Sequence, residues 1–259
     1  MLTLKRMGVM NVTPNSFSDG GSISGTDSFK SKLKSFGNVD AIDIGAESTA
    51  PMNQSIFWEE EWERLLPFIP FILESEVTIS LDTYHPETID QFLKVWKDQN
   101  CKRPIIWNDV SGKFDHFAKA FLKYDPSFTY IFCHNLAPLR ELSGKHMEYK
   151  WSSEGEDFLN ELASYFRGRI HPQVIFDPCL GFSKTYEQNW YILDHFHELQ
   201  KKTGHDRWLL GFSRKSFLRK KFNLEIDQRD ELDRVHGELL SKIKMDGEVW
   251  IRTHRPELL

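Results

Sequence analysis

Residues 77–83 read VTISLDT, a short and nearly continuously apolar run that ends at Asp82. Runs of this kind are typical of strands buried on both faces. Three further runs end in the same way and carry polar groups at their carboxyl ends: 39–45 (VDAIDIG) with Asp43, 104–109 (PIIWND) with Asn108 and Asp109, and 174–177 (VIFD) with Asp177. In a parallel barrel all strand C-termini open onto one face. We therefore expect these groups to converge on one polar site and the chain to be an enzyme.

Strand-like runs alternate with amphipathic stretches along the whole chain. The alternation predicts a parallel sheet, and eight repeats favour closure into a (β/α)8 TIM-type barrel. The expected strands are 6–12, 39–45, 77–83, 104–109, 129–134, 173–177, 208–212 and 249–253. The expected helices are 26–36, 56–74, 86–98, 115–123, 157–169, 186–202 and 227–245, with Asp27 and Asp157 as helix caps.

The last expected strand is followed only by residues 254–259, which are too few for an eighth helix. The barrel is therefore expected to lack its last helix, and the groove between strand 8 (Val249, Trp250, Ile251) and strand 1 to lack its cover. Exposed apolar grooves usually mark an interface. We expect either a homodimer through this flank or cover by neighbouring helices and the tail 256–259.

Length and composition describe one ordinary globular domain, residues 1–259, with 40% hydrophobic and 27% charged residues. A net charge of −5 and a pI of about 6.1 give no basic field for nucleic acid or an anionic membrane. The three cysteines are far apart and have no CxxC spacing, which argues against a disulfide framework and for a reducing compartment. No apolar run reaches the ~18 residues of a membrane span, so the expected location is cytoplasmic.

Two clusters of anion-binding character follow the last two expected strands. Residues 211–216 (GFSRKS) offer two cations and two hydroxyls at a helix start, and Arg252-Thr253-His254 ends strand 8. Loops after strands 7 and 8 are the usual phosphate site of such barrels, so we expect an anion subsite there. There is no GxGxxG or GxxxxGK[ST] motif. The irregular segments 15–25, 46–55 and 135–155 each follow a strand end and should lie over the polar face.

Seven ordered segments make the chain resemble a dihydropteroate synthase from Met7 to His254. They are MNVTPNSFSDGG, DIGAEST, SLDTYHPE, NDVSG, DPCLGFSKTYEQN, GFSRKSF and RTH, each at an expected strand end. This family joins 6-hydroxymethyl-7,8-dihydropterin diphosphate to para-aminobenzoate and releases pyrophosphate. The resemblance implies a transferase of folate biosynthesis with these two small-molecule substrates.

The resemblance also implies a role for individual residues. Asp82, Asn108, Asp177 and Lys215 would hold the pterin, with Asp82, Asp177 and Lys215 as the catalytic groups. Asn11 would ligate a Mg²⁺ ion that binds the diphosphate, while Thr49, Arg252 and His254 would contact the anion. Ser213 and Lys215 would border the aminobenzoate site. Carboxylates suit the row of N–H donors on a pterin, and they would stabilise positive charge on it as the C–O bond breaks.

The chain departs from the family pattern mainly on the aminobenzoate side. Ala50 stands where the family has an arginine, and Asn15 replaces an aspartate, although Asp19 is kept. Glycine positions are taken by Ala46, Cys179 and Ser183, and CHNLAP replaces an MHM-type segment after strand 5. Three functions stay open: an active synthase, a non-catalytic pterin-binding paralogue, and a pterin-dependent transferase with another acceptor.

Several polar residues also have purely structural interpretations. Asp43 would either touch ligand or form hydrogen bonds within the barrel mouth. His134 is more typical of a satisfied structural histidine, and Cys133 and Cys179 of small buried residues than of nucleophiles.

Overall fold

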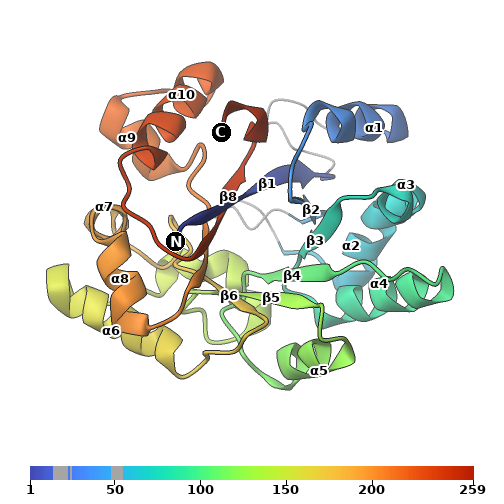
Figure 1. Cartoon of the computed structure of the whole chain (residues 1–259), viewed down its shortest axis with the longest axis horizontal. Helices are drawn as coiled ribbons and strands as arrows, with labels where there is room; N and C mark the ends of the chain where they lie inside the picture. The colour runs from blue at the N-terminus through green and yellow to red at the C-terminus, as the bar shows by residue number, and fades with distance from the viewer. Residues whose placement is uncertain (14–22, 24, 48–54) are drawn as a thin grey trace.

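Eight parallel strands close into a barrel in sequence order, β1 to β8, with β8 paired to β1. The structure, a computed structural model, describes residues 1–13, 23, 25–47 and 55–259 (Figure 1). The strands are β1 (Thr3–Asn11), β2 (Ala41–Gly45), β3 (Thr78–Asp82), β4 (Ile105–Asp109), β5 (Thr129–Cys133), β6 (Val174–Asp177), β7 (Arg207–Leu210) and β8 (Glu248–Thr253). The predicted fold class, a (β/α)8 barrel, is confirmed.

Helices surround the barrel in the connections between strands (Figure 1). The α-helices are α1 (Thr26–Ser35), α2 (Trp58–Leu65), α3 (Ile69–Glu74), α4 (Pro86–Asp98), α5 (His116–Tyr124), α6 (Gly155–Arg167), α7 (Tyr186–Asp194), α8 (Phe196–Thr203), α9 (Ser216–Phe222) and α10 (Arg229–Leu240). Short 3₁₀ segments are η1 (Leu66–Phe68), η2 (Arg140–Glu148) and η3 (Pro256–Leu258).

Proline and local hydrogen bonding divide two of the helices expected as single units. Pro67 and Pro70 lack the N–H that a continuous helix needs, and the expected helix 56–74 becomes α2, η1 and α3. The expected helix 186–202 is likewise divided at His195 into α7 and α8. The predicted caps were wrong: Gly25 and Glu154 are the N-caps, and Asp27 and Asp157 lie in the first turns. Asp115 caps α5 by accepting from the N–H groups of Phe117 and Ala118.

The barrel interior changes from apolar to polar along its axis. One buried cluster inside the barrel contains Met7, Ala41, Ile106, Ile131, Ile175, Leu209 and Trp250. Because side chains alternate along a strand, the residue two positions later points to the same face. Two positions after Ile106, Ile175 and Trp250, the same strands carry Asn108, Asp177 and Arg252, respectively. The carboxyl end of the barrel is therefore lined with polar groups that stand on an apolar floor.

The flank between β8 and β1 is covered, which corrects the expectation of an open apolar groove. Trp250 points into the barrel and is 7% exposed, while Val249 and Ile251 are 0% and 3% exposed. Val249 and Ile251 share a buried cluster with residues of α9, and Leu239 and Leu240 of α10 pack against that cluster. The 3₁₀ turn η3 packs against β1, with Pro256 buried. Residues 254–259 after β8 form the short η3 and no α-helix, and the covered flank gives no support for a homodimer.

Within the described ranges, no helix has both the length and the apolar character needed to cross a membrane.

Candidate active site

A cavity of about 350 Å³ opens at the carboxyl end of the barrel. Its lining includes all but one of the predicted site residues: Asn11, Asp82, Asn108, Asp177, Ser213, Lys215, Arg252 and His254. Thr49, the remaining one, lies outside the described residues, as do Asn15, Asp19 and Ala50. Asp43 and Asp109 do not line the cavity, so the predicted convergence holds for Asp82, Asn108 and Asp177 but not for all strand-end acids.

Asp43 organises the floor of the cavity rather than lining it. It is fully buried and accepts hydrogen bonds from Ser80 Oγ at 2.5 Å and from Asn108 Nδ2 at 3.0 Å. The guanidinium of Arg252 forms ion pairs with both Asp43 and Asp82. Burial disfavours the charge on Arg252, but the two carboxylates outweigh it and raise the pKa of Arg252. The structural interpretation of Asp43 is therefore the one that the contacts support.

The same contacts orient Asn108 so that its carbonyl oxygen is an open acceptor. Because its Nδ2 donates to Asp43, Oδ1 is directed elsewhere, and no group in the described part of the chain donates to it. Asn108 is only 2% exposed, and an unsatisfied buried acceptor costs free energy unless a ligand supplies a donor. This geometry is typical of a site that binds a ligand N–H.

Asp82 and Asp177 provide two carboxylates on opposite sides of the barrel mouth. Burial raises the pKa of Asp177 to about 6, although the Cys179 N–H donates to its Oδ1 at 2.6 Å and lowers it. Burial also raises the pKa of Asp82, and the Arg252 guanidinium opposes that rise. Both carboxylates are thus desolvated acceptors, whose ionised forms gain from any ligand that donates N–H bonds or carries positive charge.

The predicted anion end is formed by the segments after β7 and β8. Ser213 Oγ lies 3.0 Å from His254 Nδ1, and Lys215 Nζ lies 4.6 Å from the centre of the Phe182 ring. The lysine fits because a Cβ on Gly181 would lie 3.3 Å from its Cδ, and Gly181 has a φ of +88° that favours glycine. Arg214, in contrast, donates through Nε and Nη2 to both oxygens of Asp233 on α10. Both Lys215 and Arg214 of the GFSRKS cluster therefore line the cavity, and the arginine also attaches α10.

His146 and Met147 of η2 line the cavity and were not predicted. His146 is buried and stacks on the Phe182 ring with centroids 3.8 Å apart. The sequence predicts that the irregular segment 135–155 lies over the polar face, and η2 does so, but it did not identify the two side chains that line the cavity.

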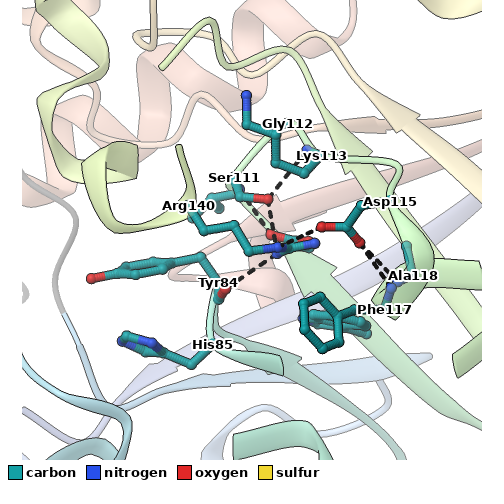
Figure 2. A network of polar contacts seen from close by, with 12 residues as sticks. Tyr84, His85, Ser111, Gly112, Lys113, Asp115, Phe117, Ala118 and Arg140 are labelled. Atoms are coloured by element: carbon teal, nitrogen blue, oxygen red, sulfur yellow. Dashed lines mark hydrogen bonds and ion pairs between the residues drawn. The ribbon is translucent and has the colours of Figure 1, made fainter. Parts of the chain in front are cut away.

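Arg140 fixes the start of η2 through contacts with the end of β4 and with the two connections that follow β3 and β4 (Figure 2). Its guanidinium donates to Asp109 Oδ2 at 2.6 Å, Asp115 Oδ2 at 2.9 Å, Ser111 Oγ at 3.0 Å and the Tyr84 carbonyl at 3.2 Å. Asp109 is fully buried, which raises its pKa, and Arg140 opposes that rise. Asp109 faces outward because it follows the inward-facing Asn108, so its role is to hold Arg140 rather than a ligand.

His134 has a structural role, as expected. It is fully buried, and its Nδ1 lies 2.8 Å from the Nζ of Lys184. Burial and the Lys184 charge lower the pKa of His134 well below its usual value, so the ring is neutral. Lys184 also donates to the carbonyls of Phe182 and Cys179, and burial lowers its pKa to about 7.

Cys133 and Cys179 are buried, as expected, but their sulfurs are joined in a disulfide. The prediction of unpaired cysteines is therefore wrong for this pair. Cys101 remains the free thiol among the three cysteines.

The residues present fit Mg²⁺ only as an ion shared with a substrate. Across the described ranges, the grouping of three or more acidic, His or Cys ligands that could hold a metal is Cys133, Asp177 and Cys179. The two sulfurs are joined in a disulfide and would be poor ligands for magnesium, which prefers oxygen and binds through few protein groups plus substrate phosphates. Asn11 offers one such oxygen at the end of β1, beside Gly45, where a Cβ would lie 3.6 Å from Asn11 Oδ1.

Comparison with known proteins now decides the family. Residues 7–254 match the Pterin binding enzyme family. The dihydropteroate synthase of a Synechocystis strain is 32% identical over 245 residues, 89% of this chain and 77% of that protein. The enzyme of Clostridium beijerinckii is 33% identical, over 87% of this chain and 80% of that protein. The chain belongs to the dihydropteroate synthase family.

Solved structures agree with this assignment. Dihydropteroate synthase from Anaplasma phagocytophilum, with bound 6-hydroxymethylpterin-monophosphate, superposes with a TM-score of 0.76 at 27% identity, covering 99% of this chain and 95% of that one. The Thermus thermophilus enzyme in complex with 4-aminobenzoate gives 0.73 at 25% identity, covering 98% and 90%. As a member of the dihydropteroate synthase family, the chain is a transferase of folate biosynthesis.

Proposed function

We propose that this enzyme joins 6-hydroxymethyl-7,8-dihydropterin diphosphate to para-aminobenzoate and releases pyrophosphate. The observation that carries the proposal is the open acceptor Asn108 Oδ1 between Asp82 and Asp177 in one barrel-mouth cavity. A pterin offers amino and ring N–H donors along one edge, and this set of acceptors satisfies them. Related structures bind a hydroxymethylpterin phosphate and 4-aminobenzoate, which supports transferring both substrate classes to this chain.

At the pterin end, Asp177 and Asn108 accept N–H bonds from the heterocycle. Lys215 and the stacked rings of Phe182 and His146 form the wall of the cavity beside it. Asp82 lies on the other side and keeps its ion pair with Arg252. The buried pair places a fixed negative charge and a fixed positive charge below the substrate, at no reorganisation cost during the reaction.

At the anion end, the diphosphate lies toward Ser213, Lys215 and His254, with Asn11 on the side of β1. Magnesium, when bound to Asn11 and the diphosphate, would neutralise charge on the departing pyrophosphate. Arg252 contributes here through its ion pairs with Asp43 and Asp82, which hold its positive charge below the substrate.

The chemical step needs no strong base. The aminobenzoate amine attacks the methylene carbon next to the pterin ring while the C–O bond to the diphosphate breaks. Positive charge then develops on the pterin, and the carboxylates of Asp82 and Asp177 stabilise it. The cavity supplies orientation and electrostatics, and the hydrogen-bonded Ser213 and His254 in its lining are assigned to the diphosphate rather than to nucleophilic catalysis.

A second candidate is a transferase that uses another amine as its acceptor. Ala50 supports it, because the family arginine at that position contributes to aminobenzoate binding. We also propose a cytoplasmic location, because both substrates are anions.

Pyrophosphate release tests the proposal. We expect the protein to release pyrophosphate from the pterin diphosphate only when para-aminobenzoate is present. Asp177→Ala should abolish most of this activity, whereas Asp157→Asn, at an exposed position of α6, serves as the matched control. Release with another arylamine but not with para-aminobenzoate selects the second candidate. No release with any amine contradicts both.

A further inference from the structure

Cys133 and Cys179 connect the ends of two neighbouring strands. Cys133 is the last residue of β5, Cys179 lies two residues beyond the end of β6, and their Cα atoms are 5.5 Å apart across 46 residues of chain. Cys133 pairs in register with Asp177, the last residue of β6. The disulfide therefore ties the β5 end to the segment that follows Asp177.

This disulfide belongs to the wall of the proposed pterin cavity. Cys179 lines the cavity and is 5% exposed, whereas Cys133 is fully buried behind it. The Cys179 N–H donates to Asp177 Oδ1 at 2.6 Å. Any displacement of the Cys179 backbone would thus change the hydrogen bonding of the carboxylate that is proposed to bind pterin.

The backbone at Cys179 is in a conformation that a cysteine does not favour. Its φ is +54°, in the left-handed region where an L side chain crowds the backbone. Such conformations persist where surrounding contacts hold them. The bond to Cys133 is one such contact, and it is lost when the pair is reduced.

We propose that Cys133 and Cys179 are a reversible dithiol–disulfide pair that controls pterin affinity. The oxidised pair holds the segment after β6 in the shape that binds pterin, and the reduced pair allows Cys179 to leave the left-handed region. The effect on affinity rests on the proposed pterin site at Asp177; formation of the disulfide does not.

Hydrogen peroxide is the oxidant that suits this geometry, because it is small enough to enter the cavity. The Cys179 thiolate attacks a peroxide oxygen, the O–O bond breaks, and the leaving oxygen departs as water after taking up a proton. The Cys133 sulfur then attacks the Cys179 sulfenic acid, the S–S bond forms, and the S–O bond breaks, releasing a second water with the Cys133 proton. Two thiols lose two electrons to one peroxide.

The first measurement counts thiols without using pterin. It uses the full chain with Cys101→Ser, which removes the free thiol and leaves two cysteines. After reduction, a thiol reagent added under denaturing conditions should find two thiols, and after treatment with stoichiometric hydrogen peroxide it should find none. Mass spectrometry should show the loss of two hydrogens. Two thiols that persist, or oxygen added to either sulfur as the end product, would overturn the proposal.

The second measurement compares pterin binding in the two states by calorimetric titration with 6-hydroxymethylpterin. In the reduced Cys101→Ser protein, Cys179 can leave its strained conformation. We therefore expect the reduced protein to bind pterin about three- to tenfold more weakly than the oxidised one. Cys133→Ser in this background cannot form the disulfide and should show no gain of affinity after peroxide treatment. Cys179→Gly, which tolerates the positive φ without a sulfur bond, should also ignore peroxide and bind nearly as tightly as the oxidised protein.

Equal affinities in the oxidised and reduced Cys101→Ser protein, or tighter binding in the reduced one, would overturn the control of affinity. Absence of pterin binding in every form would instead contradict the proposed pterin site, with the thiol count still deciding whether the pair forms.

Discussion

Asp177 carries a carboxylate whose pKa burial raises to about 6. Pterin N–H donors favour the ionised form, so binding must expel a proton when the pH is below that value. Pterin affinity should therefore fall as the pH decreases through about 6 and level off above it. Asp82, whose pKa burial also raises, adds to the same fall.

Asp177→Asn should lose about tenfold in pterin affinity at pH 8, from the ~1–3 kcal/mol of a charge-assisted bond, and its pH profile should be flatter. Calorimetric titration from pH 5 to 8 checks this, with Asp157→Asn as the exposed control. A variant that kept the wild-type profile would show that another group governs binding.

Arg252 is the second residue with a sharp expectation. Its ion pairs with Asp43 and Asp82 mean that Arg252→Ala leaves two buried carboxylates without their cation. Such losses cost about 3–5 kcal/mol of unfolding free energy. We expect weaker binding of both pterin and pyrophosphate, together with a lower denaturation midpoint. A variant that lost only pyrophosphate binding, at unchanged stability, would show that Arg252 faces the anion instead.

At the scale of elements, α2 is attached to the loop after β3 by the buried Glu61. Its Oε2 accepts from Thr83 and Thr88, and burial raises its pKa to about 7 despite these bonds. A raised pKa means that the folded state holds the proton more tightly than the unfolded state does. The stability from Glu61 is therefore complete below about pH 4.5 and is lost as the pH rises through 7.

Glu61→Gln should remove this dependence. Relative to the variant, the wild type should lose about 3 kcal/mol between pH 4.5 and 7.5, at 1.4 kcal/mol per pKa unit. Urea denaturation across this range measures it, and Glu63→Gln, exposed on the same helix, is the control. Parallel profiles for wild type and Glu61→Gln would mean that Glu61 is ionised throughout.

The element η2 depends on Arg140 for its attachment (Figure 2). Arg140→Met removes the cation and leaves Asp109 buried and unpaired, which should cost about 3 kcal/mol or more. The double variant with Asp109→Asn should recover part of that loss in chemical denaturation. No recovery would show that the aliphatic packing of Arg140, not its charge, holds η2.

Element boundaries were predictable where one local signal dominated. The strands 104–109 and 129–134 and the helix 86–98 were predicted within a residue or two, because apolar runs and Pro86 mark them. The inward position of Asn108 and Asp177 followed from the same runs. The position of segment 135–155 over the polar face was predicted, but the side chains that η2 places in the cavity were not, since Arg140 meets Asp109 and Tyr84 only in three dimensions.

For the whole molecule, the apolar floor of the barrel carries the polar site above it. Trp250 belongs to this floor, and Trp250→Ala should open a void and cost about 3–5 kcal/mol. Leu4→Ala is the matched control, because Leu4 lies beside Val249 in the register but is 54% exposed, and should change stability by less than about 0.5 kcal/mol. Equal losses in guanidinium denaturation would contradict the assignment of Trp250 to the interior.

The flank between β8 and β1 is covered, although the sequence predicted an open apolar groove there. Counting elements gave one helix per strand, but two helices follow β7, and residues of α9 and α10 pack with Val249 and Ile251 (Figure 1). The sequence contains both helices, yet their placement depends on Arg214 binding Asp233 and on packing that no local pattern reveals.

A crystal structure with 6-hydroxymethylpterin bound would test most directly whether Asn108 and Asp177 bind the pterin. We expect the pterin ring in the barrel-mouth cavity, with its N–H groups within hydrogen-bonding distance of Asn108 Oδ1 and the Asp177 carboxylate. Arg252 should still be paired with Asp82. A ring bound outside this cavity, or one that leaves Asn108 Oδ1 without a donor, would contradict it.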